Sequence, residues 1–393
     1  MESLVLFYLL VAGVALIAAA WAAGLLLVAA ISQIWHSPQA RQWLRWFFGL
    51  GEVARPAPKL TVSLIIPAYN EEATLRETIR SVKAQTYPLV QVIVIDDCSQ
   101  DRTSQIALEE NVTVLRTPGN SGSKARAQID SDILVTIDAD TLLAPDAVEK
   151  LMSAFHEKKV AAACGFVIPQ RISSIWERGR FIEYLYGITV HKGSQSNFKS
   201  VLVASGCFCA FRTDLLKVYG GFPLRTMAED MDITWQFLEA GFEVKFIAEA
   251  FCYPLDPHDY TTFRKQVERW YRSYLQNISA HRSTLWRNKR LTFFVYWYLL
   301  YGMLMPLLLL GSAMLLIWSR QGQGLVFVIA LELATVTLIC SVQGIRQERL
   351  TAVLGSVLPY YFVLKPVNVY LFWRSLWLEW VRRERLSWWD KGH

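Results

Sequence analysis

The chain has 393 residues, of which 53% are hydrophobic, and a formal net charge of +6 at neutral pH. This hydrophobic fraction is too high for an ordinary soluble domain. The basic residues gather beside apolar segments, a pattern typical of membrane topology and of contacts with lipid headgroups. Membrane lipids are therefore expected as partners, and nucleic acid is not.

The apolar residues are concentrated at the two ends of the chain. Ser3–Ile34 is nearly uncharged and longer than the roughly 20 residues that a membrane helix needs. Its apolar core is too long for a cleavable signal peptide, and no basic residue precedes it. Leu291–Trp318 and Leu325–Ile345 are predicted as two further spans, and Thr351–Trp380 is a fourth apolar region.

The charges beside these segments predict the side of the membrane. Lys and Arg accumulate on the cytoplasmic side, and they flank the central part of the chain, so we expect the central part to be cytosolic. The protein is then a multi-pass protein of a bacterial inner membrane or plasma membrane. Lys365-Pro366 interrupts the fourth region, which leaves two readings open: a hairpin, or a short span followed by an interfacial helix.

The central part alternates between strand-like and helix-like segments. Its four apolar, β-branched runs cover residues 60–68, 90–97, 112–117 and 132–140, with helix-prone stretches between them. Such alternation predicts a mostly parallel sheet with helices on both faces, an α/β fold. Sheets of this kind bind ligands beyond the carboxyl ends of their strands.

Polar residues follow three of these runs. Asp138 and Asp140 end the fourth, Asp97 ends the second, and Tyr69 and Glu71 follow the first. Carboxylates crowded at one rim repel one another unless a cation or a donor-rich ligand lies among them, and oxygen ligands beside phosphates suit Mg²⁺ or Mn²⁺. The alternative is a set of ordinary turn aspartates. We favour that alternative for Asp96 alone, and not for the set.

Successive segments of the central part resemble the motifs of the inverting family-two glycosyltransferases with a GT-A fold. The first are "SLIIPAYNEE", "VIVIDDCSQDRT", "GNSGSKARA" and "ILVTIDADT". They are followed by "LVASGCFCAFRTDLLKVYGGF", by "TMAEDMDITWQFLEAGFEV", which is similar to the TED motif, and by "FRKQVERW", which is similar to QxxRW. The likeness covers about Leu60 to Arg272 in the family's order. QxxRW in particular resembles the membrane-embedded synthases of cellulose, chitin, hyaluronan and poly-N-acetylglucosamine.

The resemblance implies a donor site at the strand ends. Tyr69 would stack on uracil, or else pack on the sheet as a loop aromatic. Glu71 and Asp97 would bind the base edge and the ribose, and Lys124 would reach the diphosphate at a helix N-terminus. Asp140 would be the direct metal ligand. Asp138 would contact the ribose or sugar and share the metal.

The resemblance also implies an acceptor side. Asp230, with Glu229 beside it, would be the general base, although Ala228 replaces the family threonine. A capping role at the start of the helix is equally compatible with Asp230, and Asp232 is interpreted as a helix-surface residue. His258, with Asp256 and Asp259 nearby, is interpreted as a loop histidine rather than a metal ligand.

Gln266, Arg269 and Trp270 lie at positions i, i+3 and i+4, on one face of a predicted helix. By the resemblance, Arg269 would bind the diphosphate and Trp270 would be the platform under the acceptor sugar. A basic amphipathic helix on the membrane surface fits the same residues, and both roles can hold together. Ile175–Gln195 resembles the family's other interfacial helix.

The expected organisation is an N-terminal transmembrane helix (1–35), a basic juxtamembrane segment (36–58), a cytosolic GT-A catalytic domain with interfacial helices (59–282) and C-terminal transmembrane and interfacial helices (291–393). The implied function is transfer from a UDP-sugar, taken as UDP-N-acetylglucosamine, to a growing polysaccharide that leaves through the protein's own spans. Two alternatives stay open: a single-addition enzyme with a glycolipid acceptor, and a transporter or receptor with a nucleotide-binding domain. A homo-oligomer is compatible with each.

Overall fold

The computed structural model describes residues 57–117, 129–318 and 322–386. The predicted first span, almost all of the basic juxtamembrane segment, and Lys124 lie outside the described residues, so those predictions stay as they are.

The described residues form one eight-stranded sheet with the strand order β3-β2-β1-β4-β7-β6-β8-β5. The pairs β3–β2, β2–β1 and β1–β4 are parallel, whereas β7 runs antiparallel to both β4 and β6. The predicted α/β fold is therefore confirmed, with a mixed second half. The strands are β1 (Val62–Ala68), β2 (Gln91–Asp96), β3 (Thr113–Arg116), β4 (Ile133–Ile137), β5 (Leu142–Leu143), β6 (Val160–Val167), β7 (Phe208–Arg212) and β8 (Glu243–Tyr253).

Helices cover this sheet because each has one apolar stripe. In α3 (Leu75–Lys83) that stripe is Leu75, Ile79 and Val82, all of which are buried, while its charged residues face outward. The other short helices of this part are α4 (Thr103–Glu109), α5 (Ala147–Met152), the 3₁₀ turn η1 (Ser153–His156) and α8 (Thr213–Val218). Strands β1 and β4 are almost wholly buried, as near-continuous apolar runs in a covered parallel sheet should be.

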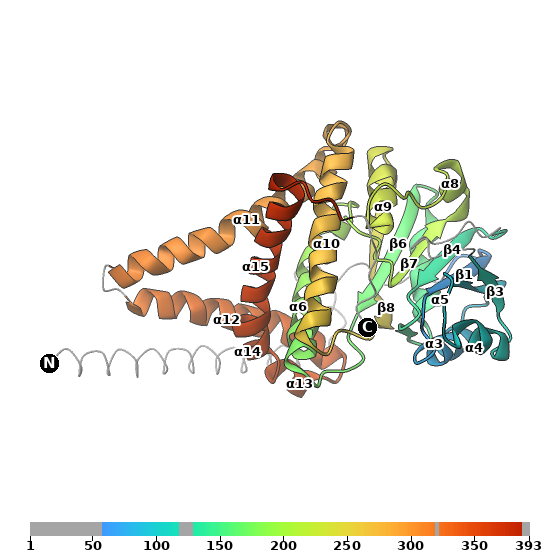
Figure 1. The fold of residues 1–393 in the computed structure, drawn as a ribbon, viewed down its shortest axis with the longest axis horizontal. Coiled ribbons are helices and arrows are strands. Elements are labelled where there is room, and N and C mark those ends of the chain that lie inside the picture. Colours follow the sequence, from blue (N-terminus) through green and yellow to red (C-terminus); the bar gives the residue numbers. More distant parts are fainter. Residues whose placement is uncertain (1–56, 118–128, 319–321, 387–393) are drawn as a thin grey trace.

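A second group of helices stands beside the sheet. Figure 1 shows α6, α10 and α15 side by side, between the sheet and a pair of helices, α11 and α12, that projects away from it. The bounds are α6 (Ile175–Gly187), π turn η2 (Ile188–Lys192), α7 (Gly193–Asn197), α9 (Glu229–Glu239), α10 (Tyr260–His281), 3₁₀ turn η3 (Leu285–Arg287), α11 (Lys289–Trp318), α12 (Gly322–Arg346), α13 (Leu350–Leu354), α14 (Val357–Pro359), π turn η4 (Tyr360–Leu364), α15 (Lys365–Leu376) and π turn η5 (Trp377–Val381).

Two helical segments of the described chain are long and apolar enough to cross a bilayer, Ile329–Arg346 and Leu350–Val381. In an apolar 18-residue window of the second segment, 22% is buried inside the protein, and many other residues of the segment are half-buried. The predicted span at Leu291–Trp318 is a single helix, α11.

The predicted interruption at Lys365-Pro366 is wrong. The chain is helical without a break from Val357 to Val381, and Pro366 stands in the first turn of α15. A π turn, η4, directly precedes it and supplies the extra residue that lets the backbone pass a proline. The hairpin reading therefore does not hold.

Candidate active site

The carboxyl ends of β1 and β2 are tied together by their turn residues. Ala68 pairs with Asp96 in the sheet, and the Asp97 amide donates to the Ala68 carbonyl at 2.9 Å. Asn70 has a left-handed backbone (φ 54°), which asparagine tolerates better than most residues. Its side-chain oxygen accepts a hydrogen bond from the Gln100 amide at 2.8 Å. These bonds fix the edge on which Tyr69 and Glu71 lie.

Asp96 and Asp97 are neighbours with different surroundings. Asp96 is fully buried and accepts hydrogen bonds from the Ser99 amide (2.8 Å) and the Ser104 hydroxyl. Burial alone would raise the pKa of Asp96, but these bonds lower it below the ordinary value. The interpretation of Asp96 as an ordinary turn aspartate fits these contacts. Asp97 is 7% exposed, and its carboxylate accepts from the Thr117 hydroxyl at 2.7 Å.

Tyr69 and Glu71 stand at the same rim. Both are half-buried. The Glu71 amide donates to the Thr103 hydroxyl at 2.7 Å, and one Glu71 carboxylate oxygen accepts from the Thr74 hydroxyl at 2.8 Å. The start of α4 therefore holds the Glu71 backbone in place beside the strand ends.

Asp138 and Asp140 follow β4 in a tight turn. The Thr141 amide donates to the Asp138 carbonyl at 3.1 Å, and the Gln170 side chain donates to the Asp140 carbonyl at 2.7 Å. The Asp138 side chain is exposed and that of Asp140 is half-buried. Asp132, at the other end of the same strand, instead accepts from the amide and hydroxyl of Thr61, each at 2.8 Å. The chain therefore has one Asp-x-Asp pattern, Asp130–Asp132, before β4 and another, Asp138–Asp140, after it.

Asp230 lies in the first turn of α9 and is held from two sides. The Gly206 amide donates to its Oδ2 at 2.7 Å, and the Met231 amide donates to its Oδ1 at 2.8 Å. The N-cap position of this helix is Ala228, so the alternative in which Asp230 is the capping residue is wrong. Gly206 precedes β7, and this contact brings the segment similar to the family's acceptor side against the TED-like segment.

The electrostatic environment of Arg269, in α10, includes carboxylates from the end of β4 and from the start of α9. Burial lowers the pKa of this α10 guanidinium, and the negative charges of Asp138, Glu229, Asp230 and Asp140 act in the opposite direction. All four carboxylates therefore lie within electrostatic range of Arg269 and favour its charged form. The sequence prediction placed these residues in one site, and the structure brings the four carboxylates into that range, while the role of each residue stays a prediction.

Gln266 and Trp270 lie on the same face of α10 as Arg269. Trp270 is 39% exposed, although its ring contacts the guanidinium of Arg180 on α6. The Gln266 side-chain oxygen accepts from the same guanidinium at 3.1 Å. Helix α10 also packs on α15 and on η5, and Arg272 of α10 pairs with Glu379 of η5 at 2.8 Å.

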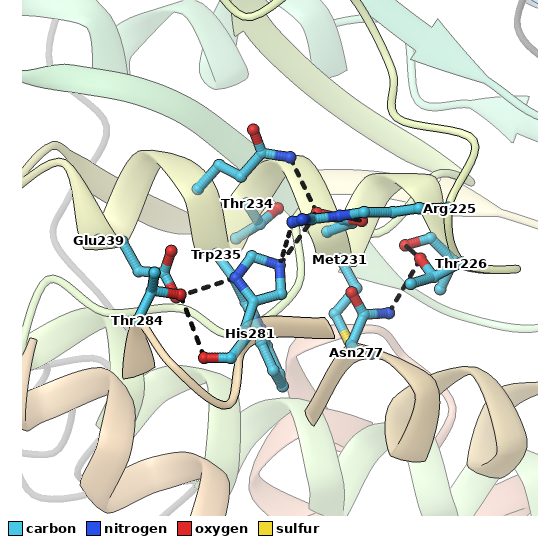
Figure 2. Close-up of polar contacts among 12 residues, drawn as sticks. Arg225, Thr226, Met231, Thr234, Trp235, Glu239, Asn277, His281 and Thr284 are labelled. Carbon is cyan, nitrogen blue, oxygen red and sulfur yellow. Dashed lines mark hydrogen bonds and ion pairs between the residues drawn. The ribbon is translucent and has the colours of Figure 1, made fainter. Parts of the chain in front are cut away.

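A buried polar cluster anchors α9 to the end of α10, and it contradicts the reading of Asp232 as a surface residue. Asp232 is fully buried. Its two oxygens accept from Arg225, each at 2.7 Å, and Oδ1 also lies 3.0 Å from His281. His281 in turn contacts Glu239 at 2.9 Å (Figure 2). The cluster holds the helix that carries Asp230.

This cluster predicts a pH window for stability. Burial would raise the pKa of Asp232, but Arg225 and His281 lower it, so its contribution is present above about pH 4 and is lost as the pH falls through the lowered value. Burial would lower the pKa of His281, but Asp232 and Glu239 raise it. Its contribution is present below about pH 6.5 and is lost as the pH rises through the raised value.

We therefore expect the melting temperature of the wild type to fall on both sides of this window. In His281→Gln the alkaline side should flatten, because no imidazolium is left to lose its proton. His156→Gln, at an exposed histidine of η1, is the control and should keep the wild-type profile. An unchanged alkaline side in His281→Gln would show that the ion pair with Asp232 does not contribute.

The strand-end carboxylates fit a divalent cation whose remaining coordination positions are filled by substrate phosphates and water. Among the described residues, no group of three or more His, Cys, Asp or Glu side chains is arranged to hold a metal ion. Asp138 and Asp140 offer hard oxygen atoms at an open rim. Mg²⁺ is commonly held by one or two carboxylates together with substrate phosphates and water, and this set matches that pattern. His258 contacts Glu177 at 3.1 Å, while Asp259 caps α10, so these two side chains have separate partners.

The comparisons with known proteins agree with this geometry. Residues 63–220 match the family model "Glycosyl transferase family 2". These residues form a family 2 glycosyltransferase domain. The motif resemblance found in the sequence is therefore confirmed for this part of the chain.

Two relatives of this glycosyltransferase domain are synthases. The hyaluronan synthase of Streptococcus pyogenes is 30% identical over 241 residues, which cover 55% of this chain and 57% of that protein. The poly-beta-1,6-N-acetyl-D-glucosamine synthase of Staphylococcus epidermidis is 29% identical over 219 residues, which cover 53% of each. The chain thus spans little more than half the length of these relatives.

A solved structure shows the same fold. The mannosyltransferase of Pyrobaculum calidifontis, in complex with GDP-mannose and Mn²⁺, superposes with a TM-score of 0.50 at 19% identity. The match covers 87% of this chain and 99% of that one. The fold of the family 2 glycosyltransferase domain and its helices is of the GT-A type.

Sequence reasoning missed two groups of residues beside this site. One is the cluster of Asp232 and His281, and the other is Arg180. A signal was present for Asp232, because Trp235 and Leu238 of α9 show that one face of the helix is buried. Arg180 gave no such signal, since an arginine in an interfacial segment is ordinarily exposed.

Proposed function

We propose that the chain is an inverting, metal-dependent glycosyltransferase that moves a sugar from a UDP-sugar to the growing end of a polysaccharide. The observation that carries the proposal is that Asp138, Asp140 and Asp230 all lie within electrostatic range of Arg269. A donor diphosphate needs cationic partners, and an acceptor hydroxyl needs a base. Both kinds of group are within that range here. A nucleotide-binding regulatory domain would have no use for a carboxylate held beside the donor site.

The proposed donor half is built on the strand ends. Tyr69 stacks on the base, Glu71 and Asp97 bind the base edge and the ribose, and Lys124 together with Arg269 contacts the diphosphate. Asp140 and Asp138 would hold Mg²⁺ or Mn²⁺. When bound, the metal acts as a Lewis acid that offsets the charge on the departing UDP.

In the proposed reaction the acceptor hydroxyl attacks the anomeric carbon from the side opposite the diphosphate. The new C–O bond forms while the bond to UDP breaks, and the hydroxyl proton passes to the Asp230 carboxylate. The Gly206 amide, bonded to Oδ2 at 2.7 Å, orients that carboxylate. Glu229 directly precedes Asp230 in the first turn of α9. Its negative charge would repel another anion that approaches the base.

The relatives support the choice of substrates. One is named a poly-N-acetylglucosamine synthase and the other a hyaluronan synthase, which supports UDP-N-acetylglucosamine as the donor and a polysaccharide as the acceptor. The two candidate spans, Ile329–Arg346 and Leu350–Val381, support a multi-pass membrane protein. We propose that the domain at 59–282 faces the cytoplasm and that the product leaves through the spans beside it.

Trp270 tests the acceptor side of this proposal. Trp270→Ala removes the flat face that holds each new sugar end, so polymer should no longer form. UDP should still bind, because the donor residues are unchanged, and slow donor hydrolysis should persist. Trp270→Phe should retain part of the transfer rate, since stacking needs a ring face more than the indole N–H. Radiolabelled product is sized by gel filtration, and UDP binding is measured separately.

The matched control is Trp286→Ala, at a tryptophan of η3 that is 68% exposed and stacks on Tyr296. It should make polymer of wild-type length. Full-length product from Trp270→Ala would exclude the platform role. A product extended by a single sugar from the wild type would instead favour a single-addition enzyme.

A further inference from the structure

Arg180 is a buried cation beneath the face of α10 that carries Gln266 and Trp270. It lies in α6 and is only 1% exposed. Its guanidinium carbon lies 4.7 Å from the centre of the Trp270 ring and 4.7 Å from the centre of the Phe263 ring. Cation–π contacts of this kind strengthen when they are removed from water. Arg180 therefore supports one face of the Trp270 ring, while 39% of that residue stays exposed.

Two arms of the guanidinium donate hydrogen bonds, and Nε, which makes none with the described residues, faces a carboxylate. Nη2 donates to the Gln266 side-chain oxygen at 3.1 Å, and Nη1 donates to Glu183 at 2.5 Å. Nε faces Asp256 at 3.5 Å, and the Tyr184 hydroxyl donates to the same carboxylate oxygen of Asp256 at 3.0 Å. A planar group with directed donors is fixed in orientation by such partners, which a lysine ammonium would not be. The fixed plane in turn defines where Trp270 and Gln266 can lie.

The partners of Arg180 connect it to two other parts of the protein. Glu183 accepts a hydrogen bond from Asn368 of α15 at 2.7 Å, so the cluster reaches the C-terminal helix. Burial raises the pKa of Asp256 to about 7, and the negative charge of Asp140 acts in the same direction, so Asp256 is within electrostatic range of a donor-site carboxylate. Arg180 thus contacts the Trp270 ring directly and is connected to α15 through Glu183.

We propose that Arg180 is a positioning residue for the acceptor. It sets the orientation of the Trp270 ring and the Gln266 amide, and through them the angle at which the acceptor sugar meets the donor. This inference rests on the proposed function, because it assigns Arg180 a role in the transfer reaction. Arg180 itself need not touch either substrate.

The decisive variant is Arg180→Lys, which keeps the charge but loses the planar stacking and the directed fork of donors. We expect transfer to acceptor to fall by about tenfold, the scale of one desolvated cation–π contact. Affinity for UDP should stay the same. The share of donor lost to hydrolysis should rise, because a badly placed acceptor competes poorly with water. A variant that only loosened the packing around Arg180 would not change this partition of the donor between hydrolysis and transfer.

The matched control is Arg178→Lys in the same helix. The Arg178 side chain donates to the carbonyls of Ser173 and Gly355, each at 3.4 Å. This control should keep the wild-type partition. A double-mutant cycle adds a second criterion: in a Trp270→Ala background, Arg180→Lys should change the rate of donor hydrolysis by a smaller factor than it does in the wild type, because one of the two side chains through which it acts is already absent.

A second variant covers the case in which Arg180→Lys does not fold. Glu183→Gln keeps the side-chain shape and weakens one partner of the guanidinium, and it should shift the partition in the same direction by a smaller factor. A wild-type partition in both folded variants, or in Glu183→Gln alone if Arg180→Lys is unfolded, would overturn the inference. An equal loss of UDP affinity and transfer would also overturn it. If Trp270→Ala itself makes full-length polymer, the platform in the proposed function fails instead.

Discussion

Asp230→Asn is expected to lower the rate of sugar transfer by about 10²- to 10⁴-fold, the usual cost of losing a general base. The amide is nearly isosteric but cannot accept the proton of the acceptor hydroxyl. UDP affinity should change little, because the proposed donor-binding residues come from the strand ends and from α10. The measurement combines initial transfer rates with UDP binding by calorimetry on the same purified protein.

A matched control exists in α8. Asp214 also lies in the first turn of its helix and also accepts, through Oδ1, from the next amide in the chain, that of Leu215 at 2.8 Å. Asp214→Asn should therefore transfer sugar at the wild-type rate. Near-normal transfer by a folded Asp230→Asn variant would place the base elsewhere in the site.

Removal of divalent metal is the second change with a large expected effect. Excess chelator should abolish transfer, and Mg²⁺ or Mn²⁺ should restore it, because the diphosphate cannot leave as an uncompensated anion. Asp140→Ala should lose donor binding as well as turnover. Isothermal titration with UDP, with and without metal, separates these effects from a loss of fold.

Asp132→Ala is the control for this experiment. Asp132 ends the other Asp-x-Asp pattern of β4 and bonds to Thr61 at the opposite end of the strand. This variant should respond to chelator and metal as the wild type does, with a lower melting temperature. Full activity of the wild type in excess chelator would contradict the proposal that transfer depends on a divalent metal.

The site residues that could be predicted are those set by local sequence. A β-branched run that ends in Asp138 and Asp140 places both at a strand end, and parallel neighbours bring Tyr69 and Asp97 to the same edge. Spacing on a helix likewise placed Gln266 and Trp270 on one face. Each of these inferences needs only the periodicity of one element and the direction of its neighbours.

The residues that were missed depend on contacts between distant segments. Asp232 meets His281 across 49 positions, and Arg180 meets Gln266 across 86. Trp235 and Leu238 mark one buried face of α9, but no local pattern specifies which distant side chains meet a carboxylate there, so Asp232 was interpreted as a surface residue. Pro366 was misread for a related reason, because the π turn directly before it compensates for the proline.

The most direct test of the account is to give the purified full chain in membrane vesicles a panel of radiolabelled UDP-sugars and to size the product. We predict that one UDP-sugar, UDP-N-acetylglucosamine, is converted into a long polymer with release of an equal number of UDP molecules. Asp230→Asn in the same vesicles should make none. Binding of UDP without turnover of any donor in the panel would contradict the proposal that this chain is a glycosyltransferase.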